Sequence, residues 1–168
     1  MKKILVVSDS HHNNQTINKI LVHHPEIEIC IHCGDLQDQI ETLNTKTLYL
    51  VKGNHDILDL PDTLIINIES TRILITHGHL QNVELSLSKI TDLAIKEKVD
   101  TICFGHTHNP IKIINKDILI INPGSIKFPK NINIFIPTYA ILTINKNQQE
   151  VHFYHADSFD NIDDLVYK

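Results

Sequence analysis

The sequence has few cysteines and no long apolar run, and both absences restrict the class of protein. Three cysteines among 168 residues are an odd and sparse set that gives no disulfide framework. Cys30 and Cys33 have C-x-x-C spacing, but no second pair completes a zinc site, so a buried strand is favoured over a redox or zinc motif. No apolar run could span a bilayer, so we expect no membrane association. The opening apolar run ends at Ser8 and Asp9, so it is shorter than the apolar stretch of a secretory signal. We therefore expect a cytoplasmic protein.

The sequence also lacks an excess of basic residues. Its formal net charge is -5 with histidine neutral, and its lysines and arginines are scattered. We therefore expect no stable nucleic-acid binding through a basic face. A nucleotide is still compatible with this charge as a substrate, because bound metal ions would make a site positive. Internal repeats, low-complexity tracts and Gly/Ser linkers are absent as well, which predicts one domain over residues 1–168.

Hydrophobic patterning indicates alternating strands and helices in the first half of the chain and mostly strands in the second. Strands are expected over residues 3–8, 27–32, 47–51, 64–68, 72–76, 101–104, 111–114, 118–121, 139–144 and 151–154. Helices are expected over residues 17–21, 36–43 and 83–98, where apolar residues recur at helical spacing. This order predicts an α/β sandwich with mixed sheets.

Histidine is unusually frequent, with 12 residues against a single methionine. Several of the histidines belong to five short motifs that each follow an expected strand. The motifs are Asp9-Ser10-His11, Gly34-Asp35, Gly53-Asn54-His55-Asp56, His77-Gly78-His79 and Gly105-His106-Thr107-His108. Residues i and i+2 of an extended segment point the same way, so Asp9 and His11 can face one cation. Open α/β sheets place their sites at the carboxyl ends of strands, so we expect the five motifs to converge.

Each motif alone has an ordinary explanation. An Asp-x-His pair is often a turn cap or a surface pair, and Gly-Asp is a frequent turn dipeptide. Two histidines directly after an apolar strand are a stronger signal, because unpaired polar groups there are costly. The occurrence of all five motifs, each after a strand, favours a metal site. His12 and His79 adjoin motifs, and their roles stay open between support of a metal ligand and contact with a substrate.

With these motifs the sequence resembles the calcineurin-like metallophosphoesterase superfamily over nearly its whole length. The short chain, His77-Gly78-His79 and Asn122-Pro123-Gly124-Ser125 are similar to the compact bacterial and archaeal phosphodiesterase branch. The resemblance implies a four-layer α/β/β/α sandwich with two mixed β-sheets. The protein serine/threonine phosphatases have Asp-Arg-Gly after their Gly-Asp motif, whereas Leu36 and Gln37 follow here, so that subfamily is not expected.

The resemblance also implies two divalent transition-metal ions and a nearby acid. By motif position, the ligands are Asp9, His11 and His108 for one ion and Asn54, His77 and His106 for the other, with Asp35 bridging both. Oxygen and nitrogen ligands without sulfur suit Mn²⁺, which we favour, and also Zn²⁺, Fe, Ni²⁺ or Co²⁺. His55 matches the residue that in relatives contacts phosphate and assists the leaving group. Asp56 is expected either to orient His55 or to cap the next turn.

The implied activity is hydrolysis of small phosphate esters, with phosphodiesters or nucleotides favoured, by in-line attack of a metal-bridging hydroxide. One alternative is a protein-interaction scaffold, since the small retromer subunit has the same fold. Scaffold relatives tend to lose ligands, whereas all seven candidates are present here. The other alternative is a nuclease, against which the acidic balance of the chain weighs.

Residues 126–137 suggest an oligomer contact. This segment includes the large apolar residues Phe128, Ile132, Ile134 and Phe135. They suit an exposed edge of the kind found in a homodimer or homotetramer, and a buried loop is the alternative interpretation.

Overall fold

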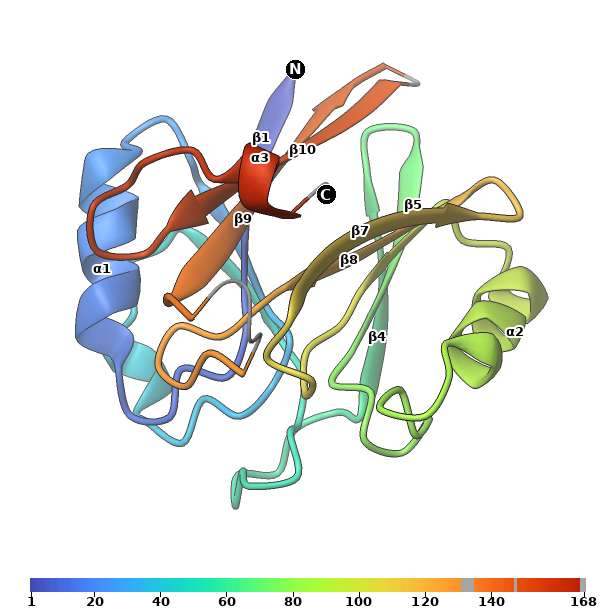
Figure 1. Cartoon of the computed structure of the whole chain (residues 1–168), viewed down its shortest axis with the longest axis horizontal. Coiled ribbons are helices and arrows are strands. Elements are labelled where there is room, and N and C mark those ends of the chain that lie inside the picture. Colours follow the sequence, from blue (N-terminus) through green and yellow to red (C-terminus); the bar gives the residue numbers. More distant parts are fainter. Residues whose placement is uncertain (131–134, 147, 167–168) are drawn as a thin grey trace.

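The computed structural model describes residues 1–130, 135–146 and 148–166 (Figure 1). Its first sheet is built from five strands. They are β1 (Lys2–Val7), β2 (Ile29–His32), β3 (Thr47–Leu50), β9 (Thr138–Asn145) and β10 (Gln148–His155). The order across the sheet is β10-β9-β1-β2-β3. β1, β2 and β3 run parallel, whereas β9 is antiparallel to β1 and β10, so the sheet is mixed.

The second sheet also has five strands. They are β4 (Thr63–Ile68), β5 (Thr71–Thr76), β6 (Thr101–Cys103), β7 (Pro110–Asn115) and β8 (Ile118–Pro123). The order is β4-β5-β6-β8-β7, with parallel pairing among β5, β6 and β8 and antiparallel pairing at both edges. The carboxyl ends of β1, β2, β5 and β6 therefore carry four of the five sequence motifs.

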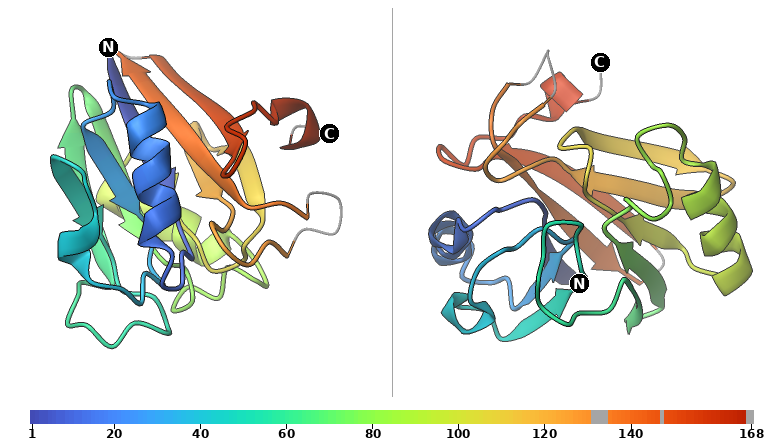
Figure 2. Two further views of the ribbon diagram at one scale, coloured as in Figure 1. Left: turned by 90° about the vertical axis from the view of Figure 1, so that its left-hand side faces the viewer. Right: turned by 90° about the horizontal axis from the view of Figure 1, so that it is seen from below.

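One helix covers the outer face of each sheet. α1 (Asn14–His23) lies against the first sheet and α2 (Ser88–Glu97) against the second, and Figure 2 shows them on opposite sides of the molecule. Alternate residues of a strand face opposite layers. Ile4 and Val6 of β1 accordingly lie in the core between the sheets, whereas Leu5 and Val7 lie in the core beneath α1. The expected four-layer α/β/β/α sandwich with mixed sheets is confirmed.

The structure corrects two of the expected helices. Residues 36–43 contain only the 3-10 turn η1 (Ile40–Thr42), because Gln37 has a left-handed backbone with a φ of 53° that no right-handed helix contains. The helix expected over residues 83–98 begins five residues later, at Ser88. Asn82 is left-handed with a φ of 54°, and the N–H of Val83 binds the carbonyl oxygen of Gly78 instead of a helical partner. Both segments that differ from the expectation are loops at the end of the sheets where the sequence motifs lie.

Three remaining features complete the fold. The four-residue helix α3 (Asp163–Val166) follows β10 and is too short for a periodic signal in the sequence. Cys30, Cys33 and Cys103 are free and buried, and burial raises the pKa of Cys30 to about 12, as suits a strand core. Among the residues described, none of the helices has both the length and the apolar character needed to cross a membrane.

Candidate metal centre

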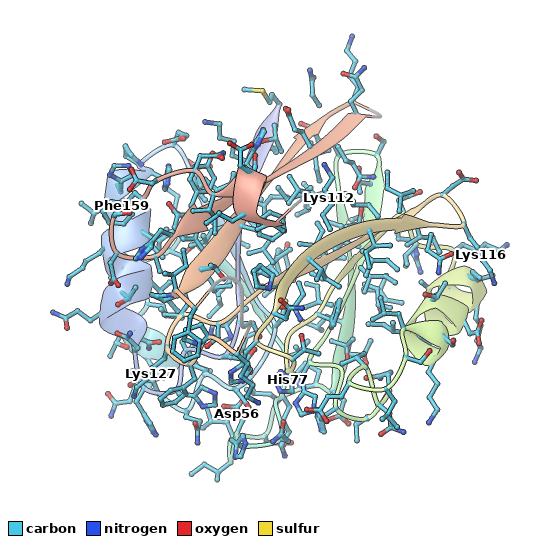
Figure 3. The ribbon with its side chains drawn as sticks, viewed as in Figure 1. Asp56, His77, Lys112, Lys116, Lys127 and Phe159 are labelled. Atoms are coloured by element: carbon cyan, nitrogen blue, oxygen red, sulfur yellow. The ribbon has the colours of Figure 1, made fainter. Side chains whose placement is uncertain are left out.

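The loops after β1 and β2 continue the parallel pairing of their strands. The N–H of Asp9 donates to the carbonyl oxygen of Gly34 at 3.0 Å, and the N–H of His11 donates to that of Asp35 at 3.1 Å. In the second sheet, the N–H of Gly105 donates to the carbonyl oxygen of His77 at 3.1 Å. These backbone bonds bring motifs that are far apart in the chain to one end of the sandwich. Figure 3 shows His77 and Asp56 at that end.

Two groups of buried side chains there are suited to hold metal ions. The first group is Asp9, His11 and His108, and the second is Asp9, Asp35 and His77. Within each group one ligand atom per residue lies within 4.8 Å of the others. Asp9 is common to both groups. Asp35 Oδ2 lies 3.5 Å from His77 Nε2 and 4.0 Å from His11 Nε2, so this carboxylate lies between the groups as a bridge would.

The histidines of both groups present the same ring nitrogen to the centre. Nδ1 of His77 is 2.7 Å from the carbonyl oxygen of Cys33, and Nδ1 of His108 is 2.6 Å from that of Phe128. A carbonyl oxygen only accepts, so Nδ1 carries the proton in both rings. Nε2 of each ring then faces the carboxylates of the centre, 3.0 Å from Asp9 Oδ1 for His108 and 3.5 Å from Asp35 Oδ2 for His77. A backbone carbonyl at Nδ1 is the usual support of a histidine that binds a metal through Nε2.

Unpaired buried atoms show that the residues fit a metal pair. Oδ1 of Asp9 and Nε2 of His11 are buried and have no hydrogen-bond partner among the described residues. Such atoms are costly unless something compensates them, and a cation between them would do so. The donor set of carboxylate, imidazole and amide groups matches the preference of divalent transition metals.

Opposite charges in the site shift each other's pKa values toward the ionised forms. Burial alone would raise the pKa of Asp9, but the neighbouring imidazoles of His108 and His77 lower it below its usual value. Burial likewise opposes charge on Asp35, yet its contact with His77 lowers its pKa to about 2. Burial disfavours a charged His77, but Asp35 and Asp9 raise the pKa of its ring. The carboxylates are therefore ionised at neutral pH, as metal ligands must be.

Five of the seven candidate ligands have a left-handed backbone. Their φ angles are 53° for Asp9, 43° for His11, 56° for Asp35, 66° for His106 and 56° for His108. Residues with a Cβ adopt this region rarely and at an energetic cost, and such strain collects at functional sites. No sequence pattern indicated this backbone conformation, since the two-residue spacing of the ligands predicted extended segments.

Asn54 and His106 lie beside the second group. Oδ1 of Asn54 is 3.1 Å from Nε2 of His77, and the rings of His106 and His77 are 5.1 Å apart. The N–H of His106 also donates to Oδ2 of Asp9, which ties the two sheets together. Nε2 of His106 lies 3.4 Å from a carboxylate oxygen of Glu84, a residue that the sequence analysis did not single out. All seven predicted ligands are thus brought to one place.

His55 lies at the rim of this cluster. Its side chain is exposed, its N–H donates to Oδ1 of Asp35 at 2.8 Å, and its ring lies 5.8 Å from that of His11.

His12 is exposed beside the site, whereas His79 is half-buried with its ring 5.4 Å from that of His77. Lys127, also missed by the sequence analysis, donates from Nζ to the carbonyl oxygen of His11 at 2.7 Å, and Figure 3 shows it near the same end of the molecule.

The buried carboxylate of Asp56 accepts three backbone N–H groups. Oδ2 accepts the N–H groups of Asp35 and Gly53, and Oδ1 accepts that of Gln37, all at 2.8 Å. The buried carboxylate therefore joins the loops after β2 and β3. Because both oxygens accept from backbone donors, the contacts favour the second of the two expected roles, support of a turn, and orientation of the His55 ring by Asp56 stays a prediction.

A glycine is required where these loops meet. A Cβ atom at Gly53 would collide with Oδ1 and the backbone nitrogen of Asp35. Only hydrogen at this position lets Asp35 approach β3 closely enough to receive the N–H of His55. The Gly-Asn-His-Asp motif therefore begins with glycine because no side chain fits at that position.

Comparison with known proteins defines the class. Residues 1–147 match the calcineurin-like phosphoesterase superfamily domain. YsnB of Bacillus subtilis, named a probable metallophosphoesterase, is 35% identical over 153 residues, which cover 90% of this chain and 89% of YsnB. A phosphodiesterase of Methanocaldococcus jannaschii is 29% identical over 171 residues, which cover 87% of this chain and 95% of that protein.

A solved structure is similar as well. The crystal structure of a conserved Streptococcus pneumoniae protein, described as a predicted phosphoesterase, superposes with a TM-score of 0.84 at 29% identity. The superposition covers 93% of this chain and 90% of the other. The chain belongs to the calcineurin-like phosphoesterase superfamily. It is a metal-dependent phosphoesterase whose His/Asp cluster is buried at the end of the two sheets.

Proposed function

We propose that the protein is a dinuclear phosphodiesterase that acts on small phosphodiesters or nucleotides. The observation that carries this proposal is the pair of buried ligand groups that share Asp9, with Asp9 Oδ1 and His11 Nε2 buried and without a hydrogen bond among the described residues. The diesterase preference is supported by the phosphodiesterase from Methanocaldococcus jannaschii that is similar over most of both chains.

We assign the ligands as the motifs suggest. One ion would be held by Asp9, His11 and His108, and the other by Asn54, His77 and His106, with Asp35 between them. Mn²⁺ is our preferred ion, with Zn²⁺, Fe, Ni²⁺ and Co²⁺ as alternatives, because mixed oxygen and nitrogen ligands suit all of them. Two such ions, when bound, neutralise phosphoryl oxygens and lower the pKa of water.

The remaining chemistry belongs to the protein's own side chains. His55 is exposed at the rim, close enough to His11 for its ring to face a phosphate at the centre. We assign it the donation of a proton to the leaving oxygen, a form of help worth about 10²–10⁴-fold. Gln37 supports this edge, because its Oε1 accepts from Nδ1 of His11 at 2.5 Å and directs Nε2 of that ring inward.

The test is hydrolysis of bis(p-nitrophenyl) phosphate by the full chain with and without Mn²⁺. We expect turnover that chelation abolishes and added Mn²⁺ restores, together with two ions bound per chain in a calorimetric titration. His108→Ala should lower both turnover and the number of tightly bound ions. A protein that binds two ions but hydrolyses neither diesters nor monoesters would instead support the scaffold alternative.

Four other expectations stay predictions. They are a single domain over residues 1–168, location in the cytoplasm, the absence of stable nucleic-acid binding, and a homodimer or homotetramer. Phe128 and Phe135 are exposed, as an oligomer contact requires, whereas Ile132 and Ile134 lie outside the described residues. Sedimentation at several concentrations would measure the oligomeric state.

A further inference from the structure

A pocket of about 370 Å³ adjoins the metal centre on the side of His55. Its lining includes His12, Gln37, Gln39, His55, Ile57 and Leu58. Two of these residues connect it directly with the centre. Gln37 binds Nδ1 of His11, and the ring of His55 lies 5.8 Å from that of His11. The pocket therefore opens directly beside the position that a phosphate bound at the metal centre would occupy.

The chemistry of the lining points to a ring rather than to a second charged group. Ile57 and Leu58 form an apolar part of the wall, and Ile57 is 96% exposed although it is a large aliphatic residue. Gln39 and His12 contribute groups that can hydrogen-bond at the polar edge of a ring, and the carboxylate of Asp38 in the same lining would repel a second anionic group. Ligand sites of about 300–1,000 Å³ usually combine such an apolar wall with a few polar groups.

We propose that this pocket, which we call the leaving-group pocket, binds a planar ring attached to the oxygen that leaves phosphorus. The proposal rests on the proposed function and makes it more specific. His55 is both the assigned proton donor and a part of the pocket wall, so the ester bond next to the ring is the one that His55 can reach. The substrate class is then a phosphodiester of an aryl or nucleoside alcohol, with the other ester group directed away.

The reaction follows from this placement. Water adds its oxygen to phosphorus, the bond between phosphorus and the ring-bearing oxygen breaks, and that oxygen leaves with a proton from His55. The products are a phosphate monoester of the retained group and the ring-bearing alcohol. Of the two protons of water, one stays on the phosphate monoester and the other returns the imidazole of His55 to its protonated state. Leu58 and Ile57 act on binding alone and take no part in proton transfer.

The experiment compares two diesters with the same retained methyl group, methyl phenyl phosphate and methyl trifluoroethyl phosphate. The two differ in intrinsic reactivity, but this difference cancels when each variant is compared with the wild type. Leu58→Ala and Ile57→Ala remove the apolar wall, and Leu58→Trp fills the pocket. Ile114→Ala is the matched control, since Ile114 is also an exposed isoleucine, 71% exposed, and lies on β7.

We expect Leu58→Ala and Leu58→Trp to lower kcat/KM for the phenyl diester about tenfold, mainly through KM, and to change that for the trifluoroethyl diester less than twofold. Ile57→Ala should act in the same direction, and Ile114→Ala should leave both values unchanged. Equal effects on both diesters, or no effect in any pocket variant, would overturn the leaving-group pocket while the hydrolase remained. If the wild type hydrolyses bis(p-nitrophenyl) phosphate with Mn²⁺ but neither methyl diester, the leaving-group pocket is wrong and the proposed function stands. If it hydrolyses none of the three diesters, both are wrong.

Discussion

The carboxylate of Asp56 accepts a hydrogen bond of 2.8 Å from the backbone N–H of Asp35. The same oxygen accepts from Gly53 and the other from Gln37, so one buried side chain sets the distance between the loops after β2 and β3. Because Asp35 lies between the two ligand groups, the geometry of the metal centre depends on a residue that contacts no ligand atom of the centre.

Asp56→Asn should therefore destabilise the protein before any metal is added. The amide group would place an N–H₂ against backbone donors, which costs about 1–3 kcal/mol of unfolding free energy. Urea unfolding in the presence of a chelator measures this cost without a contribution from metal binding. Asp59→Asn, at an exposed position a few residues further along, is the control and should behave like the wild type. Equal stability of the two variants would contradict the role assigned to Asp56.

The close contact between Gly105 and Ser8 predicts a compensating pair of substitutions. A Cβ at Gly105 would collide with Oγ of Ser8 and lie 2.9 Å from Oδ2 of Asp9. Gly105→Ala should cost roughly 1–3 kcal/mol, the usual cost of an overfilled core. Adding Ser8→Ala removes the nearest atom, so the double variant should be more stable than the sum of the single effects indicates. Thermal unfolding of all four proteins measures the coupling, and strict additivity would contradict the prediction.

The role of His55 predicts a dependence on the leaving group. His55→Ala should lower kcat/KM about 10²–10⁴-fold for diesters with alkyl leaving groups, which need a proton. Diesters of p-nitrophenol, whose oxygen leaves readily as an anion, should be affected much less. His23→Ala, which changes an exposed histidine at the end of α1, is the control and should leave both rates unchanged. An equal loss on both kinds of diester would remove the proton-donor role.

The contact between His152 and Asp163 predicts a pH-dependent contribution to stability. Nδ1 of His152 lies 2.6 Å from Oδ2 of Asp163, and this contact raises the pKa of His152. Burial opposes charge on Asp163, but the contact with His152 lowers its pKa below its usual value. The pair holds the start of α3 against β10, where Asp163 also accepts the N–H of Phe153.

The sign of the pH effect follows from these directions. The contribution of His152 is complete below its ordinary pKa of 6.5 and is lost as the pH rises through its raised value. That of Asp163 is complete above its ordinary value of 3.8 and is lost as the pH falls through its lowered one. Asp163→Asn should therefore lower Tm more at pH 5.5 than at pH 9. The exposed Asp92→Asn should show the same small change at both pH values.

The sequence by itself determined the α/β sandwich with mixed sheets and the kinds of ligand. Alternation in β1 sends Ile4 and Leu5 to opposite cores, and this local pattern is readable without any tertiary contact. The motifs after the strands named every residue of both ligand groups, because parallel strands end at a common edge. The direction of the β1 side chains and the ligand residues could both be predicted from the order of residues along the chain.

Only the tertiary structure decided how those residues are held. The N–H groups of Asp35 and Gln37 that bind Asp56 come from residues far away in sequence. The carboxylate of Glu84 beside His106 and the left-handed backbone of Asp9, whose N–H binds Gly34, also depend on distant partners. Gln37 shows the reason most clearly. Its surroundings favoured a helix, but its N–H binds Asp56 and its side chain binds His11, and together these contacts outweigh the helical preference of a short segment.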